Sequence, residues 1–297
     1  MKILLLGKNG QVGWELQRSL APLGELIALD RHQADGLNGD LSNPEALRAT
    51  IRQVQPDVIV NAAAYTAVDK AESETELADR VNGIAAGVMA EEAAASGAWL
   101  VHYSTDYVFN GQGTAAWRET DAVAPVNHYG FSKLAGERAI TASGCKHLIF
   151  RTSWVYGARG NNFAKTMLRL ARDRETLGVV ADQIGAPTGA DLIADVTAQA
   201  LRQALQHPEL AGLYHLAAAG EVSWHGYASE VIAFAKANGE SLAVKAIEPV
   251  ETTAYPTPAH RPLNSRLDTQ KLRATFSLHL PDWQSGVTRM LREILNK

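Results

Sequence analysis

The sequence has little cysteine and no long hydrophobic run. Cys145 is the single cysteine in 297 residues, which excludes an intrachain disulfide framework and any multi-cysteine zinc site and suits a reducing compartment. No stretch approaches the roughly 20 apolar residues of a membrane span. The apolar run at residues 3–6 is shorter than the roughly 7–15 residues of a secretion signal. We therefore expect a soluble, cytoplasmic protein with no membrane partner.

An excess of basic charge is also missing. Lysine and arginine number 28 against 32 aspartates and glutamates, a net charge of −4, so the broad basic field of a nucleic-acid binder is absent. Apolar residues make up 46% and charged residues 20%, which excludes a mainly disordered or collagen-like chain. The length fits one large α/β unit or a main domain with a smaller lobe.

Short apolar runs alternate with segments of helical periodicity through the first half of the chain. Strands are predicted at residues 3–6, 26–29, 58–60, 99–103 and 148–150. Helices are predicted from the start signal Ser42-Asn43-Pro44-Glu45, over the alanine-rich residues 76–95, and near residues 129–141. Nearly continuous apolar strands joined by helices indicate a parallel sheet covered on both faces. The sequence thus predicts a doubly wound, Rossmann-like α/β fold.

After about Arg151 the alternation loosens. Helices are predicted at 163–172, 190–205 and 283–295, and one strand at 213–217. We predict a dinucleotide-binding domain over residues 1–153. Residues 154–297 are predicted to form mainly a smaller substrate-binding lobe, with some segments returning to the first domain.

Three glycines, Gly7, Gly10 and Gly13, lie between the first predicted strand and the first predicted helix, with Gln11 and Val12 among them. Small residues there let the backbone approach a pyrophosphate, whose charge is met by free N–H groups at the helix start. Three glycines in a turn can instead serve tight packing alone. Both interpretations stay open at this point.

Asp30 ends the second predicted strand, 17 residues after Gly13, where a ribose-binding acid belongs in such folds. Its carboxylate favours NADH, whereas the adjacent Arg31 could pair with the 2′-phosphate of NADPH. We therefore expect either cofactor, the alternative being that Asp30 is a loop acid capping the next segment. Weaker candidates are Asp40 and Leu41 beside the adenine, and Ala62, Ala63 and Ala64 where the cofactor's ribose would pass.

Tyr129 and Lys133 form the only Y-x-x-x-K in the chain. On a helix, residues i and i+4 share a face, so phenol and ammonium can project toward one cleft. A neighbouring cation lowers the pKa of a phenol from about 10 toward its working range. The alternative is an ordinary exposed helix pair.

Ser104, Thr105 and Asp106 follow the predicted strand at 99–103, at the carboxyl edge where open α/β sheets bind ligands. A hydroxyl there can hydrogen-bond a substrate carbonyl and stabilise a developing alkoxide. The alternative is a turn-forming cluster.

These residues, in this order, resemble the extended short-chain dehydrogenase/reductase family. The likeness runs nearly end to end through GKNGQVGWEL, DVIVNAAAYTAVDKAE, HYSTDYVFNG, PVNHYGFSKLAGE, FRTSWVYG, GNNFAKTM, DQIGAPTGA and RPLNSRLD. More narrowly, the chain is similar to members that reduce the 4-keto group of dTDP-4-dehydro-L-rhamnose to give dTDP-L-rhamnose. The resemblance implies NADH or NADPH as hydride donor and a role in cell-surface polysaccharide synthesis.

The resemblance also implies roles for individual residues. Tyr129 would donate the proton, Lys133 would hold the nicotinamide ribose and tune Tyr129, and Thr105 would hold the carbonyl oxygen of the sugar. Implied substrate contacts are Asp106, Asn162, Trp154 stacked on the deoxysugar, and Arg261 on the diphosphate. Plain core packing for Trp154 and a solvated loop position for Arg261 are the alternatives.

The resemblance further implies a homodimer with a structural magnesium ion at the contact between copies. The matching positions are Glu15, Asp191 and Glu293. They have no local ligand spacing, so solvated surface carboxylates are the alternative. Aspartate at 191 is also shorter than the glutamate that the family pattern predicts.

Related reactions are the competing interpretations. A sugar-nucleotide 4,6-dehydratase typically has an Asp-Glu pair after the threonine, whereas here Tyr107 follows Thr105 and Asp106, which counts against elimination. A sugar-nucleotide epimerase stays possible. A non-catalytic, nucleotide-binding regulatory subunit is the alternative from another class, and the intact Thr105, Tyr129 and Lys133 count against it.

Overall fold

Six strands form one sheet in the computed structural model, which describes residues 1–296. Their order is β10-β5-β4-β3-β1-β2, and every neighbouring pair is parallel. Their bounds are Lys2–Leu6 (β1), Glu25–Leu29 (β2), Val58–Asn61 (β3), Trp99–Thr105 (β4), Lys146–Thr152 (β5) and Gly212–His215 (β10). The five strands predicted for this sheet are confirmed, and so is the strand predicted at 213–217 in the second half of the chain, which joins the sheet as β10; the ends are shifted by one or two residues.

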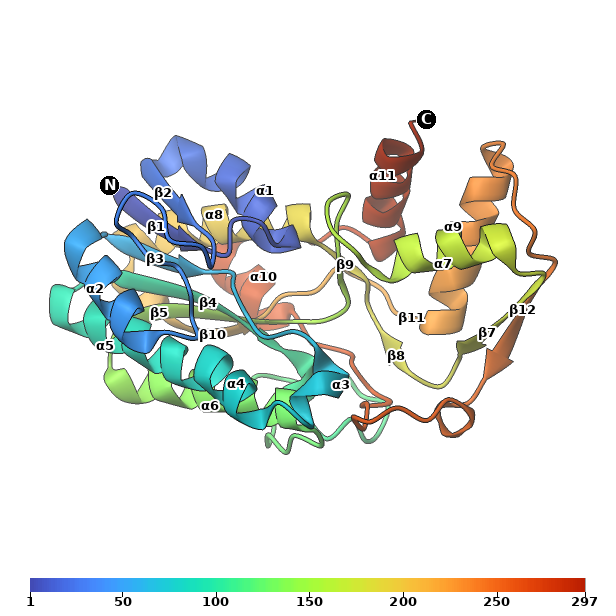
Figure 1. Cartoon of the computed structure of the whole chain (residues 1–297), viewed down its shortest axis with the longest axis horizontal. Coiled ribbons are helices and arrows are strands. Elements are labelled where there is room, and N and C mark those ends of the chain that lie inside the picture. Colours follow the sequence, from blue (N-terminus) through green and yellow to red (C-terminus); the bar gives the residue numbers. More distant parts are fainter. Residues whose placement is uncertain (297) are drawn as a thin grey trace.

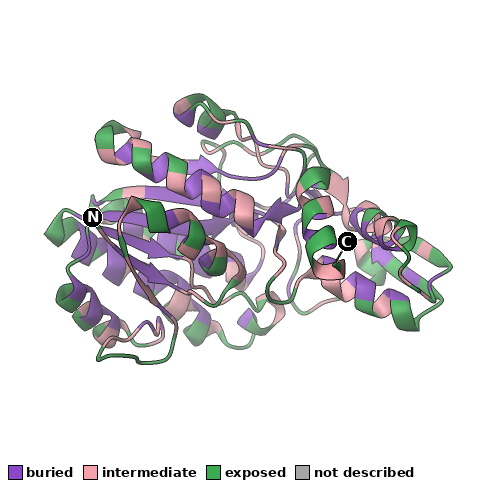
Figure 2. Cartoon of the chain, turned by 90° about the horizontal axis from the view of Figure 1, so that it is seen from above, coloured by how far each residue is buried: buried purple, intermediate pink, exposed green. Residues whose placement is uncertain are grey.

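Helices cover both faces of this sheet (Figure 1). One face carries α1 (Gln11–Leu20), α8 (Ala190–Gln206) and α10 (Gln270–Phe276), and the other α2 (Pro44–Val54), α5 (Ala85–Ser96) and α6 (His128–Ser143). Side chains alternate along β1, so Ile3 and Leu5 enter one core while Leu4 and Leu6 enter the other. Figure 2 shows the buried strands between helices whose outer faces are exposed. The predicted doubly wound, Rossmann-like fold is confirmed.

The rest of the second half builds a smaller unit with its own apolar cluster, which includes Tyr227, Val231, Trp283 and Val287. Its helices are α7 (Phe163–Asp173), α9 (Trp224–Ala237) and α11 (Trp283–Leu295), and its longest strands are the parallel pair β7 (Thr176–Val180) and β12 (Ala246–Val250). Two shorter pairs are β6 (Val155–Tyr156) with β9 (Thr188–Gly189), and β8 (Ile184–Gly185) with β11 (Val222–Ser223). The domain division between residues 153 and 154 stays a prediction.

Helix ends follow their capping residues. The side chain of Asn43 accepts a hydrogen bond from the backbone N–H of Ala46, and Pro44 occupies the first turn of α2, as the start signal predicts. Asn127 caps α6 in the same way through Gly130, 2.8 Å away. The remaining short helices are α3 (Val68–Ala71), η1 (Ala21–Leu23), η3 (Asp106–Val108), η4 (Pro208–Leu210) and η5 (Thr252–Ala254).

The alanine-rich segment at 76–95 is not one regular helix. It comprises α4 (Thr75–Asp79), a π-helical turn η2 (Arg80–Ile84) and α5. Within the turn, Asn82 hydrogen-bonds both the N–H and the carbonyl of Tyr65 and donates to the hydroxyl of Ser132. These contacts from outside the helix accompany the widened turn. None of the helices in residues 1–296 is long and apolar enough to cross a membrane.

Candidate active site

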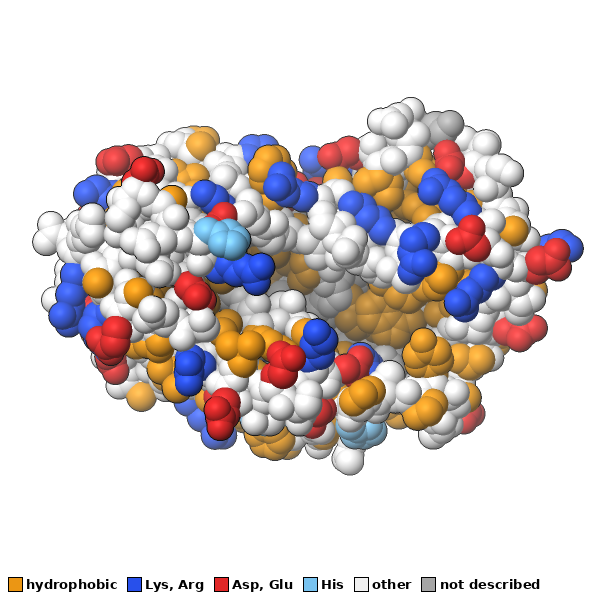
Figure 3. Space-filling view, in the orientation of Figure 1, with side chains coloured by type: hydrophobic (Ala, Val, Ile, Leu, Met, Phe, Trp, Pro, Cys, Tyr) orange, Lys and Arg blue, Asp and Glu red, His pale blue; other side chains and the backbone are white. Residues whose placement is uncertain are grey.

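The carboxyl ends of four neighbouring strands meet at one edge of the parallel sheet. Gly7 follows β1, Ala62 follows β3, Thr105 ends β4, and Trp154 follows β5 by two residues. Parallel strands end on the same side, which is where open α/β sheets bind ligands. Figure 3 shows this face of the molecule hollowed between its two halves, with hydrophobic side chains inside the hollow.

At two positions of the glycine loop, Gly7 and Gly13, neighbouring backbone lies too close for any side chain. Gly7 has φ +87°, and a Cβ there would lie 2.7 Å from the backbone nitrogen of Ala63. A Cβ on Gly13 would lie 2.0 Å from the carbonyl oxygen of Gly7, whereas one on Gly10 comes no nearer than 3.4 Å to any atom. No side chain caps the start of α1, so its first N–H groups can bind an anion. Tight packing and phosphate binding are thus compatible here.

The predicted ribose acid is held by its own loop. Asp30 accepts hydrogen bonds from the Asn9 side chain at 2.6 Å and from the backbone N–H of His32 at 2.8 Å. The His32 N–H, the largest favourable influence, lowers the pKa of this exposed carboxyl. Arg31 is exposed beside it. The structure thus places the ionised carboxylate of Asp30 and the exposed guanidinium of Arg31 side by side at the end of β2.

The weaker cofactor candidates take up different positions. Asp40 accepts a hydrogen bond from the backbone N–H of Ser42, and Leu41 is buried in the apolar core beneath the sheet. Val12 packs partly into the opposite core. Ala62, Ala63 and Ala64 are partly exposed, beside Gly7. Gln11 reaches across to Gly157 and Gly160 of the second half.

Lys133 is buried, with 2% of its surface exposed, so the ordinary exposed helix pair is the wrong interpretation. Its Nζ donates to the carbonyl oxygen of Tyr103 at 2.6 Å. Burial lowers the pKa of Lys133 to about 8, opposed by the charge of Glu137. The ammonium of a buried lysine loses solvation, which favours the neutral amine.

Tyr129 is partly buried from the first turn of α6. Burial, helped by the charge of Asp106 and opposed by hydrogen bonding with Thr105, raises the pKa of Tyr129 to about 12. The expected lowering of this pKa by Lys133 is wrong for the protein alone, because burial raises the pKa and the lysine amine donates to the carbonyl oxygen of Tyr103 instead. The phenol is therefore protonated and able to donate.

Thr105 and Asp106 lie beside that phenol at the end of β4. Thr105 donates to Asp106 Oδ1 at 3.0 Å and accepts from the backbone N–H of Tyr107 at 3.2 Å. Its hydroxyl thus also makes the turn contact that the alternative interpretation predicts. Asp106 is 2% exposed, and its Oδ2 has no hydrogen-bond partner within residues 1–296. Burial raises the pKa of Asp106 to about 6.

Trp154 has φ +48°, a left-handed conformation that is unusual for a bulky residue. Its ring stacks on Trp224 with centroids 3.6 Å apart and planes 13° apart. Gly185 also lies against the ring, since a Cβ there would come within 2.9 Å of the indole. Trp224 in turn donates from Nε1 to Gln183. Sequence reasoning missed Trp224, which follows no motif and lies 70 residues away.

Asn162 and Arg261 connect the two halves. Asn162 caps α7 and donates to Gln11 Oε1 at 3.1 Å, which brings it to the glycine loop. Arg261 forms a two-pronged ion pair with Asp69 of α3 at 2.8 and 3.1 Å. The solvated loop position for Arg261 is therefore wrong. Sequence reasoning missed Asp69, because nothing in its own segment indicates a partner 192 residues away.

The three carboxylates implied for magnesium do not assemble into a site within one copy of the chain. Glu15 lies 3.6 Å from Arg18, and Asp191 pairs with Arg289 at 2.9 Å. Glu293 is exposed on α11. Across residues 1–296 no group of three acidic, histidine or cysteine side chains could hold a metal ion. Arginines thus already neutralise two of the three predicted ligands.

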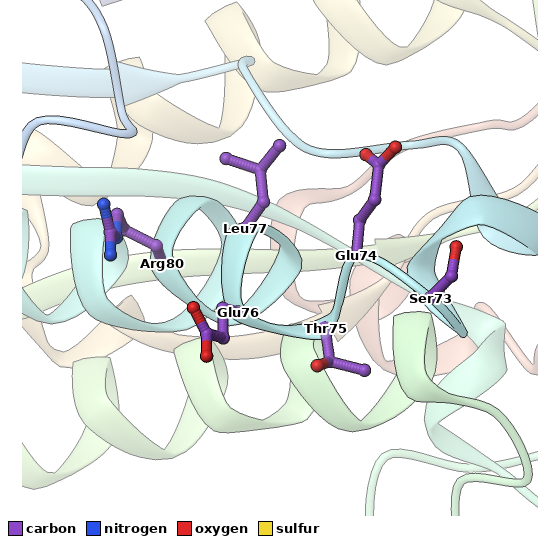
Figure 4. A pocket seen from close by; sticks show the side chains of 6 residues that line it. All are labelled: Ser73, Glu74, Thr75, Glu76, Leu77 and Arg80. Carbon is purple, nitrogen blue, oxygen red and sulfur yellow. The ribbon is translucent and has the colours of Figure 1, made fainter.

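A separate hollow lies beside α4, lined by Ser73, Glu74, Thr75, Glu76, Leu77 and Arg80 (Figure 4). None of the predicted site residues lines it. Glu74 is already engaged, because its carboxylate accepts a hydrogen bond from the hydroxyl of Tyr65 at 2.6 Å. This hollow is therefore distinct from the strand-end site.

Comparisons with known proteins identify the family of the chain. The family model of the RmlD substrate binding domain matches residues 1–296. The dTDP-4-dehydrorhamnose reductase of Escherichia coli strain K12 is 60% identical over 294 residues, covering 99% of this chain and 98% of that protein. The one from Burkholderia thailandensis is 50% identical over 303 residues and covers both chains fully. A crystal structure of the Bacillus anthracis enzyme in complex with NADP is 36% identical with TM-score 0.86, covering 98% of this chain and 99% of that one.

Proposed function

Because the chain belongs to the RmlD substrate-binding family of dTDP-4-dehydrorhamnose reductases, we propose that it reduces the 4-keto group of dTDP-4-dehydro-L-rhamnose with NADH or NADPH. The product is dTDP-L-rhamnose. The observation that carries the proposal is the grouping of Tyr129, Thr105 and buried Lys133 at the strand edge that also holds the glycine loop.

Thr105, Tyr129 and Lys133 each have a separate role in the proposed reduction. A bound reduced nicotinamide supplies the hydride. Thr105 turns its hydroxyl proton from Asp106 Oδ1 to the keto oxygen and donates a hydrogen bond to it. Tyr129 gives that oxygen its proton as charge develops on it. Because burial keeps the phenol protonated, the proton is present when hydride transfer needs it. Lys133 holds the nicotinamide ribose.

Cofactor binding is proposed for the glycine loop and the ends of β2 and β3. The start of α1 at Gly10 to Gly13 binds the pyrophosphate. Asp30 accepts from the adenosine ribose hydroxyls of NADH, and Arg31 pairs with the 2′-phosphate of NADPH. NADP in the Bacillus anthracis relative supports the second cofactor.

Substrate contacts are proposed for Asp106, Trp154, Asn162 and Arg261. The free Oδ2 of Asp106 is the buried acceptor for a sugar hydroxyl. Trp154 offers an indole edge to the deoxysugar. Arg261 contacts the diphosphate as a charge-assisted fork, which requires it to exchange Asp69 for phosphate oxygens.

A direct assay tests the function. Purified protein is mixed with NADPH or NADH and the 4-keto sugar nucleotide, and nicotinamide absorbance is followed. A loss of absorbance that depends on the substrate supports reduction. No loss with fresh substrate, while cofactor still binds, favours the regulatory subunit, and conversion of the sugar without net cofactor consumption favours the epimerase.

Further properties are proposed on the family's pattern alone. We propose a cytoplasmic homodimer whose product feeds lipopolysaccharide or another cell-surface polysaccharide. A magnesium ion at the contact between copies would have to displace Arg289 from Asp191. We therefore assign no step of the reaction to a metal.

A further inference from the structure

Behind the proposed site, Lys133 is hydrogen-bonded to a buried row of polar side chains whose other members, His102 and Asn61, have no part in the reaction described above. Its Nζ lies 3.3 Å from Nε2 of His102, a residue of β4 with no exposed surface. The opposite ring nitrogen, Nδ1, lies 3.1 Å from Nδ2 of Asn61 at the end of β3. All three side chains are at most 2% exposed, so each hydrogen-bonding atom needs a matched partner.

The donor and acceptor of each hydrogen bond in this buried row of side chains can be assigned from the backbone N–H at one end. The backbone N–H of Ala63 donates to Asn61 Oδ1 at 3.1 Å, which fixes the side of the amide that faces His102 as the NH₂ group. An NH₂ group only donates, so His102 Nδ1 accepts. Burial lowers the pKa of His102 well below its ordinary value, so the ring is neutral and carries its one proton on Nε2.

That proton points at the lysine. A lysine ammonium has three donors and no acceptor, whereas a neutral amine has a lone pair that can accept. The Nε2–H of His102 therefore matches Lys133 only as the neutral amine, which still donates to Tyr103. The other ionisable groups near Lys133 are Glu137 and Tyr129 on α6, with Asp106 of η3 beside the tyrosine and Arg151 of β5 paired to Glu137 at 2.6 Å.

We propose that His102 is a positioning residue whose Nε2–H stabilises Lys133 as a neutral amine and thereby lowers the pH at which the lysine takes up its proton. If Lys133 takes up a proton, either its hydrogen bond with His102 breaks or the donors and acceptors of every hydrogen bond back to Ala63 exchange roles. Because Ala63 packs against Gly7, the cofactor loop and the lysine charge are joined through three side chains. The proposal rests on the proposed function only for its consequence in turnover.

The ring protonation is measured directly by nitrogen NMR on the full-length protein labelled with ¹⁵N-histidine, without cofactor or substrate. The His102 signals are identified by their loss in His102→Gln. We expect Nε2 protonated and Nδ1 unprotonated at neutral pH. Protonated Nδ1 overturns the proposal, whether or not the protein reduces the keto sugar.

Two variants then test the effect on Lys133, whose titration is followed by its ¹³Cε signal and identified by its loss in Lys133→Met. Asn61→Asp keeps the shape but can accept from both Ala63 and His102 Nδ1, which reverses the chain, and His102→Leu removes the donor without adding charge. We expect the Lys133 midpoint to rise by about one pH unit or more in both. His215→Gln is the matched control, since His215 is equally buried and does not contact Lys133; it leaves the midpoint in place.

A purely structural role for His102 predicts lower stability with an unchanged midpoint, and that result overturns the proposal. If His102→Leu does not fold, an unchanged Lys133 midpoint in the nearly isosteric Asn61→Asp still overturns the proposal, because both the reversed hydrogen bonds and the added negative charge would raise it. In turnover, the part of the kcat–pH profile that reports Lys133 shifts to higher pH in the same variants. A shifted titration in a protein that shows no reductase activity would instead contradict the proposed function alone.

Discussion

The indole rings of Trp154 and Trp224 stack face to face, with centroids 3.6 Å apart, although the two residues belong to different segments. The stack supports a tryptophan whose backbone is left-handed, a conformation that persists only when its surroundings hold it. The contact thus links α9 of the smaller unit to the segment directly after β5, where the proposed sugar site lies.

Removing the partner ring is expected to loosen the sugar site. Trp224→Leu should raise KM for the keto sugar by about 3- to 10-fold, the equivalent of one aromatic pair, with a smaller change in kcat. The exciton couplet of stacked indoles in circular dichroism should disappear. Trp224→Phe, which keeps an aromatic face, should retain most of the affinity. An unchanged KM in Trp224→Leu would mean that the stack does not position Trp154.

Tyr129→Phe tests the proton donor. The variant should keep its KM for the keto sugar and lose about 10²- to 10⁴-fold in kcat, the range expected for one proton-transfer group. Initial rates with saturating NADPH measure both constants. Turnover at the rate of the unmodified protein would remove Tyr129 from the mechanism.

Two glycines of the same loop should behave differently. Gly13→Ala places a Cβ 2.0 Å from the carbonyl of Gly7, so the loop must move and cofactor affinity should fall sharply, together with the thermal midpoint. Gly10→Ala meets no protein atom closer than 3.4 Å and serves as the matched control for the thermal midpoint, which should stay near that of the unmodified protein. Titration of each variant with NADPH and a melting curve provide the comparison. Equal losses in both would show that the clash is not the cause.

Asp30 and Arg31 form a complementary pair of tests for cofactor preference. Asp30→Ala should weaken NADH by about 10-fold, because a hydrogen bond to a charged group is lost, and should weaken NADPH less. Arg31→Ala should show the reverse order. Dissociation constants for both cofactors are measured by fluorescence titration. An equal effect of Asp30→Ala on the two cofactors would mean that the acid does not face the ribose.

Removal of divalent metal should leave the reduction rate unchanged, because no step of the proposed reaction uses a metal and Asp191 is paired with Arg289. The measurement is the initial rate before and after EDTA treatment, with sedimentation velocity on the same samples. Loss of activity that added magnesium restores would contradict this assignment and revive the three-carboxylate site.

Local patterns in the sequence predict the part of the fold that local physics determines. Apolar runs such as residues 58–60 identify strands of the sheet, and Asn43 with Pro44 identifies the start of a helix, because those signals act within one element. The π-helical turn could not be predicted, since Asn82 owes its partners to Tyr65 and Ser132.

The candidate site divides in the same way. Gly7, Gly13, Tyr129 and Lys133 occur in compact motifs and are predictable from spacing. Asp69 with Arg261 depends on a long-range contact that no spacing encodes. The motif also cannot predict the rise in the Tyr129 pKa, because burial depends on how α6 packs against the rest of the chain.

Isotope transfer shows whether the protein moves hydride from the nicotinamide to the keto carbon of the sugar. NADPH carrying deuterium at the transferable position of the nicotinamide is incubated with the protein and dTDP-4-dehydro-L-rhamnose, and the product sugar is analysed by NMR. We expect deuterium on C4 of dTDP-L-rhamnose, in one configuration and in proportion to the cofactor consumed. A product with hydrogen at C4, or deuterium that stays on the nicotinamide, would contradict it.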